Sequence, residues 1–289
     1  MTFTGLHLPL ITPFTSSGAL AEDALEGLAH AAVDDGVSGI VALGTTAEAA
    51  SLTGPERARV LEICAAVCRE RAVPLTVGVE SAATAATRTA LAALDGRAAA
   101  ALVPVPAFVR PSEEGVVAHF KELATAAPVP LVIYHIPYRT SRPLSAGTLL
   151  ELAAIPGVAG FKYAAGGVDD TTVVFMAGRP ERTAVLAGDD LAASPLLALG
   201  ASGAVLASAH LETERFVRLV ELWRTGPVGE ARALGHELAV LSAALFAEPN
   251  PVVIKAVLAA RGAIPSPAVR LPLLPAGPEA TAAALRRLP

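Results

Sequence analysis

The sequence has little cysteine, little charge of either sign and no long uninterrupted apolar run. Two cysteines among 289 residues cannot form a disulfide framework. Charged residues make up 17% of the chain, the net charge is −5 and no basic patch stands out, so we expect no nucleic-acid partner. Glycine, proline or polar residues interrupt every run of about 18 residues, so we expect no membrane span. The N-terminus lacks the pattern of a signal peptide, and we therefore expect a cytoplasmic protein.

Hydrophobic residues are abundant, at 53% of the chain, which excludes a disordered protein. Short, continuously apolar runs alternate with longer segments of helical period, a pattern typical of parallel strands covered on both faces by crossover helices. About eight such units can be counted, so the sequence predicts an α/β fold, a (β/α)8 TIM barrel. The expected strands lie near Leu6 to Ile11, Ser38 to Leu43, Pro74 to Val79, Ala100 to Val105, Pro130 to Tyr134, Val158 to Phe161, Ala184 to Leu186 and Ala204 to Ala207.

Capping residues mark the starts of several expected helices. Thr53-Gly-Pro-Glu56 predicts a capping box, and Ser112 predicts another N-cap. The eighth unit is expected to end near Trp223. We therefore expect a barrel over residues 1–224 and a C-terminal helical region over residues 225–289 packed on it. The helical runs of this region are Val228 to Phe246, Pro251 to Arg261 and Pro278 to Leu288.

Lys162 is the most informative polar residue, because active sites of such barrels lie at the carboxyl ends of the strands. The chain contains only three lysines, and this one directly follows the expected strand Val158 to Phe161. At the barrel mouth its amine would be partly desolvated, which lowers the pKa and frees the amine to attack a carbonyl. The alternative is a lysine that only extends from a strand end to solvent.

The other two lysines and the two cysteines have simpler interpretations. Lys121, beside Glu122, and Lys255, inside a helical run, are expected in ordinary surface or interface positions. Cys64 and Cys68 stand four residues apart on a predicted helix with no His or other Cys nearby. We expect both to be buried apolar residues rather than metal ligands.

Hydroxyl groups near other strand ends suggest a proton path and an anion site. The phenol of Tyr134, expected one strand away from Lys162, can donate and accept a proton while a carbinolamine loses water. Thr45 could relay that proton, and Thr46 with the Gly44 turn could hold a substrate carboxylate. Ordinary turn chemistry is the alternative for the two threonines. His135 is expected to face the helices, because side chains alternate along a strand.

Six short segments spread over nearly the whole chain carry a further signal. They are Gly44-Thr-Thr-Ala-Glu48, Arg110-Pro-Ser112, Tyr134-His-Ile-Pro-Tyr-Arg-Thr140, Gly160-Phe-Lys162, Gly188-Asp-Asp190 and Glu248-Pro-Asn-Pro251. Each is weak alone. Taken together, the six segments show that this sequence resembles the dihydrodipicolinate synthase and N-acetylneuraminate lyase family, barrel enzymes that act on pyruvate through a Schiff-base lysine.

The resemblance implies a role for each matching residue. Lys162 would bind pyruvate as an imine, Tyr134 would act as the acid and base, and Thr45 would be its relay partner. Thr46 would hold the pyruvate carboxylate.

Three further residues match positions around the substrates. Arg139 matches an arginine of the synthase branch that binds the carboxylate of the aldehyde acceptor, a task suited to a bidentate guanidinium. A structural ion pair is the alternative for Arg139. Gly188 and Val205 match positions that line the pyruvate pocket.

The sequence also departs from the family pattern. Phe108 stands where the family has an interface tyrosine that completes a proton relay across a dimer, and phenylalanine cannot carry a proton. Ala107 replaces a second tyrosine, which puts lysine feedback inhibition in doubt. Ala47 replaces the glycine of the Gly-Thr-Thr turn, and the usual G-T-G reads Gly78-Val79-Glu80.

The resemblance thus implies condensation of pyruvate with L-aspartate-4-semialdehyde in the lysine and diaminopimelate pathway. One alternative is a 2-keto-3-deoxy sugar acid aldolase or dehydratase of the same family, and another is a catalytically silent barrel that binds a keto acid. No cofactor or metal is expected, because the sequence has no H-E-x-x-H, no P-loop and no G-x-G-x-x-G after a strand. The expected partners are the two small-molecule substrates and further copies of the chain, in a homotetramer built as a dimer of dimers.

Overall fold

A computed structural model describes residues 3–80, 82–94 and 96–289. Residues 1 and 2 of the N-terminal segment therefore lie outside the described part of the chain. The strands follow one another in sequence order around a closed parallel barrel, which confirms the predicted TIM barrel. They are β1 Gly5–Pro9, β2 Gly39–Ala42, β3 Leu75–Gly78, β4 Ala100–Pro104, β5 Leu131–His135, β6 Val158–Tyr163, β7 Ala184–Ala187 and β8 Gly203–Val205.

The helices between and after the strands begin largely where the sequence predicts. Thr53 forms the predicted capping box with Glu56, and the Ser112 hydroxyl accepts a hydrogen bond from the Gly115 N–H at 3.2 Å. None of the helices in the described residues is long and apolar enough to cross a membrane. The α-helices are α1 Glu22–Asp34, α2 Gly54–Glu70, α3 Thr84–Ala92, α4 Glu113–Ala126, α5 Pro137–Thr140, α6 Ala146–Ala154, α7 Asp170–Gly178, α8 Ala193–Ala198, α9 Thr213–Thr225, α10 Val228–Leu245, α11 Val252–Ala260 and α12 Pro278–Leu285; the 3-10 helices are η1 Thr45–Ala47, η2 Ala49–Ser51 and η3 Ala207–His210.

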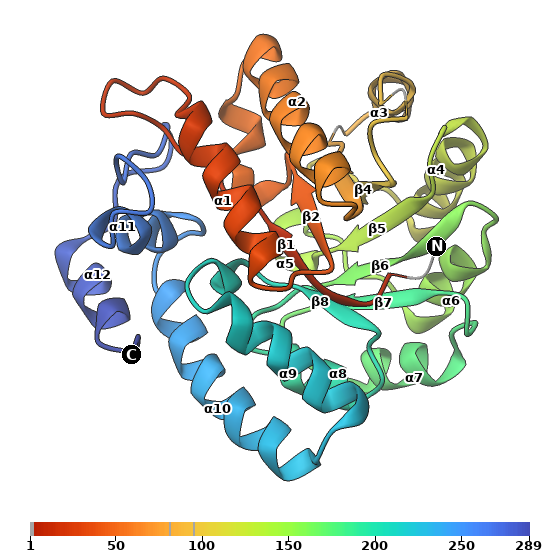
Figure 1. Ribbon diagram of the computed structural model, residues 1–289. Coiled ribbons are helices and arrows are strands. Elements are labelled where there is room, and N and C mark those ends of the chain that lie inside the picture. Colours follow the sequence, from red (N-terminus) through yellow and green to blue (C-terminus); the bar gives the residue numbers. More distant parts are fainter. Residues whose placement is uncertain (1–2, 81, 95) are drawn as a thin grey trace. The chain divides into compact units, whose positions relative to one another are not determined.

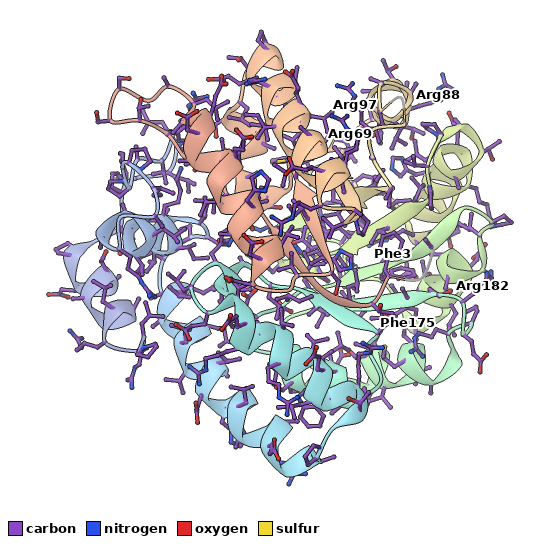
Figure 2. All side chains as sticks on the ribbon, viewed as in Figure 1. Phe3, Arg69, Arg88, Arg97, Phe175 and Arg182 are labelled. Atoms are coloured by element: carbon purple, nitrogen blue, oxygen red, sulfur yellow. The ribbon has the colours of Figure 1, made fainter. Side chains whose placement is uncertain are left out.

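The described chain divides into two compact units, one of residues 3–5, 76–80, 82–94 and 96–205 and the other of residues 6–75 and 206–289. In the first unit, strands β4 to β7 run side by side (Figure 1). Helix α7 covers one face of β6, where Phe175, labelled in Figure 2, packs its ring 5.1 Å from Phe161 and 5.7 Å from Tyr163. Successive side chains of a strand point to opposite faces. Lys162 therefore points away from α7.

In the second unit, β1 pairs with β2 and the C-terminal helices pack on one another. Helix α10 lies along α9, and α12 contacts both α10 and α11 (Figure 1). These three C-terminal helices confirm the helical runs predicted after residue 225. Cys64 and Cys68 on α2 are buried and free, as predicted. The domain division at residue 225 stays a prediction.

Gly160 on β6 leaves no room for a larger residue, and this gives a first prediction. A Cβ at Gly160 would lie 2.4 Å from the carbonyl oxygen of Ala184 on the paired strand β7. We expect Gly160→Ala to lower the free energy of unfolding by about 1–3 kcal/mol, because overpacking shifts backbone at the strand that carries Lys162. Urea denaturation measures this loss.

Gly27→Ala is the matched control, because Gly27 lies on the exposed side of helix α1 and a Cβ there meets nothing within 4 Å. It should leave the stability unchanged or raise it by about 1 kcal/mol, since alanine favours helix. Equal stability of the two variants would contradict the packing argument.

Candidate active site

Lys162 lies inside strand β6, which extends two residues beyond the predicted end at Phe161. Strand β6 ends at Tyr163, so the Lys162 backbone is paired on both sides, with Tyr134 of β5 and Leu186 of β7. The residue is only 6% exposed. Its Nζ lies 4.3 Å from the centroid of the Tyr134 ring. The structure thus brings together the amine and the phenol that the sequence singled out, on the same face of adjacent strands.

The surroundings of the Lys162 amine lower its pKa from 10.5 to about 8. Burial is the largest cause, because the charged form loses its hydration. The carboxylates of Asp190 and Asp189 oppose this effect, and the Arg139 guanidinium adds to it. A neutral amine is therefore accessible near neutral pH, as attack on a carbonyl requires.

Gly188 fits against the stem of Lys162. A Cβ at Gly188 would lie 2.9 Å from Lys162 Cγ and 3.1 Å from both Ala164 Cβ and the carbonyl oxygen of Tyr163. Any side chain here would push the lysine out of its position. Glycine is therefore required by a close approach at this point, where the loop after β7 begins.

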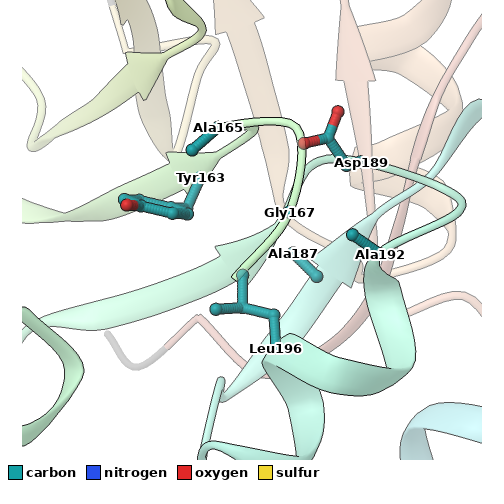
Figure 3. Close-up of a pocket in the computed structure, with 7 residues that line it drawn as sticks. All are labelled: Tyr163, Ala165, Gly167, Ala187, Asp189, Ala192 and Leu196. Atoms are coloured by element: carbon teal, nitrogen blue, oxygen red, sulfur yellow. The ribbon is translucent and has the colours of Figure 1, made fainter. Parts of the chain in front are cut away.

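Asp189 follows on the same loop, beside the loop that leaves β6. Its Oδ2 accepts a hydrogen bond from the Gly166 N–H at 2.5 Å, and burial raises the pKa of its carboxyl. Asp189, Tyr163 and Leu196 are among the residues that line the pocket in Figure 3. Neither Lys162 nor Tyr134 lines this pocket, because Tyr163 lies on the side of β6 that faces α7. We therefore place the candidate chemistry on the opposite face of β6.

The remaining predicted residues of the first unit lie at three separate places. Arg139, on the short helix α5, is exposed, and its guanidinium carbon lies 4.9 Å from the centroid of the Tyr138 ring. Within the described part of the chain we find no ion pair to Arg139, and its role stays a prediction. Val205, at the end of β8, is 2% exposed. Phe108, after β4, is 95% exposed.

In the second unit, Thr45 and Thr46 form the tight turn η1 directly after β2. Thr45 is half-buried and Thr46 is 3% exposed. Ala47 follows in the same 3-10 turn, with φ outside the left-handed region, so the backbone does not require the glycine that the family has there. The left-handed residue of this turn is Glu48, with φ 52°.

The expectation that Lys255 occupies an ordinary surface or interface position is wrong. Its side chain is fully buried, and Nζ donates to Glu48 Oε1 at 2.6 Å and to the Thr12 carbonyl oxygen at 2.9 Å. The same Nζ lies 4.1 Å from the centroid of the Phe14 ring. Every residue of helix α11 from Val252 to Leu258 is buried, so the helix has no solvent-exposed face on which a lysine could lie. The sequence did contain a signal for this burial, namely a lone lysine within an apolar helical run. A charge buried there needs a partner of opposite charge.

The contact between Asn250 and Thr46 was not predicted from the sequence. The Asn250 Nδ2 donates to Thr46 Oγ1 at 2.9 Å. The only sequence signal was the Glu248-Pro-Asn-Pro251 segment, which by itself assigns no role to the amide. By contrast, Lys121 is exposed and pairs with Glu151 at 2.8 Å, as a surface lysine should. Among the described residues no three His, Cys, Asp or Glu side chains are grouped so that they could hold a metal ion.

The buried pair predicts a large stability effect. Lys255→Met would leave Glu48 buried without its cation, and we expect a loss of about 3–5 kcal/mol in the free energy of unfolding. The double variant Lys255→Met/Glu48→Gln should lose less, because no uncompensated charge remains. Chemical denaturation of both variants measures the difference.

Lys121→Met serves as the control, because the Lys121–Glu151 pair is more than half exposed and should contribute only about 0–1 kcal/mol. A double variant less stable than Lys255→Met would show that charge burial is not the cause.

Comparison with known proteins finds relatives along nearly the whole chain. Residues 2–288 match the model of the dihydrodipicolinate synthetase family. The chain is 38% identical to the 4-hydroxy-tetrahydrodipicolinate synthase of Sorangium cellulosum, over 100% of this chain and 97% of that one. It is 36% identical to the synthase of the same name from Syntrophus aciditrophicus, over 94% and 92% of the two chains.

Solved structures of similar fold carry the same family name. The dihydrodipicolinate synthase of Acinetobacter baumannii, described as a complex with pyruvate, superposes with a TM-score of 0.94 at 30% identity, covering 99% of this chain and 98% of that one. The family match spans almost the whole sequence and the fold matches over the same range. The chain belongs to the dihydrodipicolinate synthetase family.

Proposed function

We propose that this protein is a 4-hydroxy-tetrahydrodipicolinate synthase, a class I lyase that condenses pyruvate with L-aspartate-4-semialdehyde on the way to diaminopimelate and lysine. The observation that carries the proposal is the buried Lys162 amine, with its pKa lowered to about 8 and the Tyr134 ring 4.3 Å away. The relatives of the same name support the choice of reaction.

The first step joins pyruvate to Lys162. The neutral amine attacks the C2 carbonyl carbon of pyruvate, and the resulting carbinolamine loses its hydroxyl as water to give an imine. Tyr134 delivers the proton that this hydroxyl needs to leave, a role supported by its ring lying 4.3 Å from the amine. Loss of a proton from C3 of the imine then gives the nucleophilic enamine.

The two threonines act on the proton and on the carboxylate of pyruvate. Thr45 relays the proton to and from Tyr134, and Thr46 holds the carboxylate with the backbone N–H groups of its turn. Gly188 and Val205 line the space for the three-carbon substrate. These roles rest on the family motif and on the buried position of Thr46.

The second substrate needs a cation for its own carboxylate, and Arg139 supplies it. A guanidinium binds a carboxylate through two parallel hydrogen bonds. The enamine carbon attacks the aldehyde carbon of the semialdehyde. The amino group of that substrate then attacks the imine carbon, which closes the ring and releases Lys162 as the free amine. Every step is acid–base or carbonyl chemistry, and the proposed enzyme needs no cofactor.

Phe108 sets this chain apart from the family pattern and supports self-association. Its side chain is 95% exposed, its neighbour Val109 is 61% exposed, and Phe108 has a left-handed φ of 64°. Bulky residues adopt that backbone only where surroundings enforce it. We propose that a second copy of the chain covers this segment, within a homotetramer built from dimers. We also propose that the proton relay consists of Tyr134 and Thr45 alone, because Phe108 provides no phenol. A cytoplasmic location is proposed with the same function and agrees with the free thiols of Cys64 and Cys68.

Borohydride trapping tests the proposed chemistry. Incubation of the protein with pyruvate and borohydride should add one reduced pyruvyl group to the peptide that contains Lys162, because the imine carbon accepts hydride. Peptide mass spectrometry locates the adduct. Addition of L-aspartate-4-semialdehyde without borohydride should then yield the cyclic product, detected by mass.

Two variants control this experiment. Lys162→Ala should form no adduct and no product, whereas Lys121→Ala should behave as the unsubstituted protein because Lys121 is a surface residue. An adduct that persists in folded Lys162→Ala, or its absence from the unsubstituted protein, would refute the assignment. An adduct without the cyclic product would keep the imine and remove the semialdehyde as acceptor.

The lowered pKa of Lys162 predicts the pH dependence of imine formation. Only the neutral amine attacks, so the rate of trapping should rise with pH and level off above about 8. At pH 7 roughly one amine in ten is neutral with a pKa of about 8, against roughly one in three thousand with an ordinary lysine pKa. Asp190→Asn should move the midpoint to lower pH, because the Asp190 carboxylate raises this pKa.

Asp23→Asn, on the exposed side of helix α1, is the matched control and should leave the midpoint unchanged. Initial trapping rates at a fixed pyruvate concentration between pH 6 and about 10 give the profiles. A midpoint near 10.5 would mean that burial does not lower the Lys162 pKa.

A further inference from the structure

Asn250 carries the one side-chain amide in the whole sequence, which contains a single asparagine and no glutamine. It lies between α10 and α11, yet its Nδ2 donates to the hydroxyl of Thr46 at 2.9 Å, across 204 residues of sequence. The Asn250 Oδ1 is buried and has no hydrogen-bond partner among the described residues. The one side-chain hydrogen bond that Asn250 makes within the described chain therefore goes to Thr46, the residue that holds the pyruvate carboxylate in the proposed function.

The direction of this hydrogen bond decides what the Thr46 hydroxyl can do next. A hydroxyl has one hydrogen to donate and two lone pairs that accept. Because Thr46 accepts from Asn250, its hydrogen remains available. An ionised carboxylate only accepts, so this hydrogen is what an anionic substrate needs. An acceptor at position 250 would take the hydrogen instead.

The buried ion pair fixes the distance between the two residues. Lys255 is five residues beyond Asn250, and Glu48 is two beyond Thr46. Their side chains join at 2.6 Å, and the same Lys255 amine also binds the carbonyl oxygen of Thr12. The Thr12 hydroxyl in turn donates to the carbonyl oxygen of Ala47 at 2.7 Å. The turn that carries Thr46 and the start of α11 are thus tied together.

Arg270 from the C-terminal segment completes the anchor. Its backbone N–H donates to Glu48 Oε2 at 2.9 Å, so both oxygens of Glu48 are engaged. Its guanidinium pairs with Glu56 at 2.5 Å and lies 4.3 Å from the centroid of the Phe14 ring. The Glu48 side chain therefore cannot rotate without breaking contacts to two distant segments.

We propose that Asn250 is a positioning residue that presents the Thr46 hydroxyl as a hydrogen-bond donor to the pyruvate carboxylate, with the Lys255–Glu48 pair holding the two residues in register. The inference rests on the proposed function and deepens it. It assigns to the C-terminal helices a direct part in selecting an anionic keto acid.

The test compares Asn250→Asp with Asn250→Ala by borohydride trapping at Lys162 over a range of pyruvate concentrations. Aspartate has nearly the shape of asparagine but only accepts, so it draws the Thr46 hydrogen to itself. We expect it to raise the half-saturating pyruvate concentration about 10-fold or more, because hydrogen bonds to charged groups are the strong ones. Alanine removes the donor yet leaves the Thr46 hydrogen free, and its effect should be about 2–3-fold.

Both substitutions are repeated with Thr46→Val, which removes the hydroxyl. In that background Asn250→Asp should change the half-saturating concentration by no more than about 2-fold, since coupled residues are not additive. Urea denaturation of each variant confirms that folded protein is compared. A role in packing alone predicts the reverse order, with alanine worse than the isosteric aspartate.

The outcomes separate the two proposals. If the unsubstituted protein forms no adduct, the proposed function fails and this inference fails with it. If it forms the adduct but Asn250→Asp binds pyruvate normally, or if its penalty persists in full with Thr46→Val, then only the role of Asn250 is overturned.

Discussion

The desolvation of one amine on strand β6 is the constraint on which the proposed chemistry depends. A lysine at an exposed strand end would stay protonated at neutral pH and could not attack a carbonyl. Lys162 lies inside the strand, paired to β5 and β7, with its stem against Gly188 and its amine over the Tyr134 ring. The parallel sheet buries both faces of such a strand. The fold itself therefore prepares the nucleophile, and Asp189 and Asp190 limit how far its pKa falls.

A second buried lysine shows how environment separates two identical side chains. Lys255 is as buried as Lys162, and burial lowers the pKa of both. Lys255, however, contacts the Glu48 carboxylate directly, whereas Asp190 and Asp189 raise the pKa of Lys162 through their charge. Replacing a buried ion pair by apolar residues is often neutral for stability, so such pairs are retained where they fix an arrangement. Lys255 accordingly serves the geometry of the turn at Thr46.

Two departures from the family pattern have different structural consequences. Ala47 in place of glycine is harmless, because its backbone lies in an ordinary 3-10 turn and the left-handed position belongs to Glu48. Phe108 in place of tyrosine changes the chemistry available at that position and presents an exposed ring on a left-handed backbone. The change to Ala47 therefore leaves the backbone of the turn unchanged. The second leaves a large apolar side chain exposed on this chain, which is why we proposed that a second copy covers it.

The sequence by itself determined the barrel, the three C-terminal helices, the caps at Thr53 and Ser112, and the pairing of Lys162 with Tyr134. These follow from local patterns: apolar runs, helical periods, capping residues and a rare lysine at a strand end. Only the tertiary structure decided the environment of Lys255 and the contact of Asn250 with Thr46. Both depend on partners more than 200 residues away in the sequence. A local pattern can show that a charge such as Lys255 will be buried, but the partners of such hydrogen bonds and ion pairs are set by how the chain closes on itself.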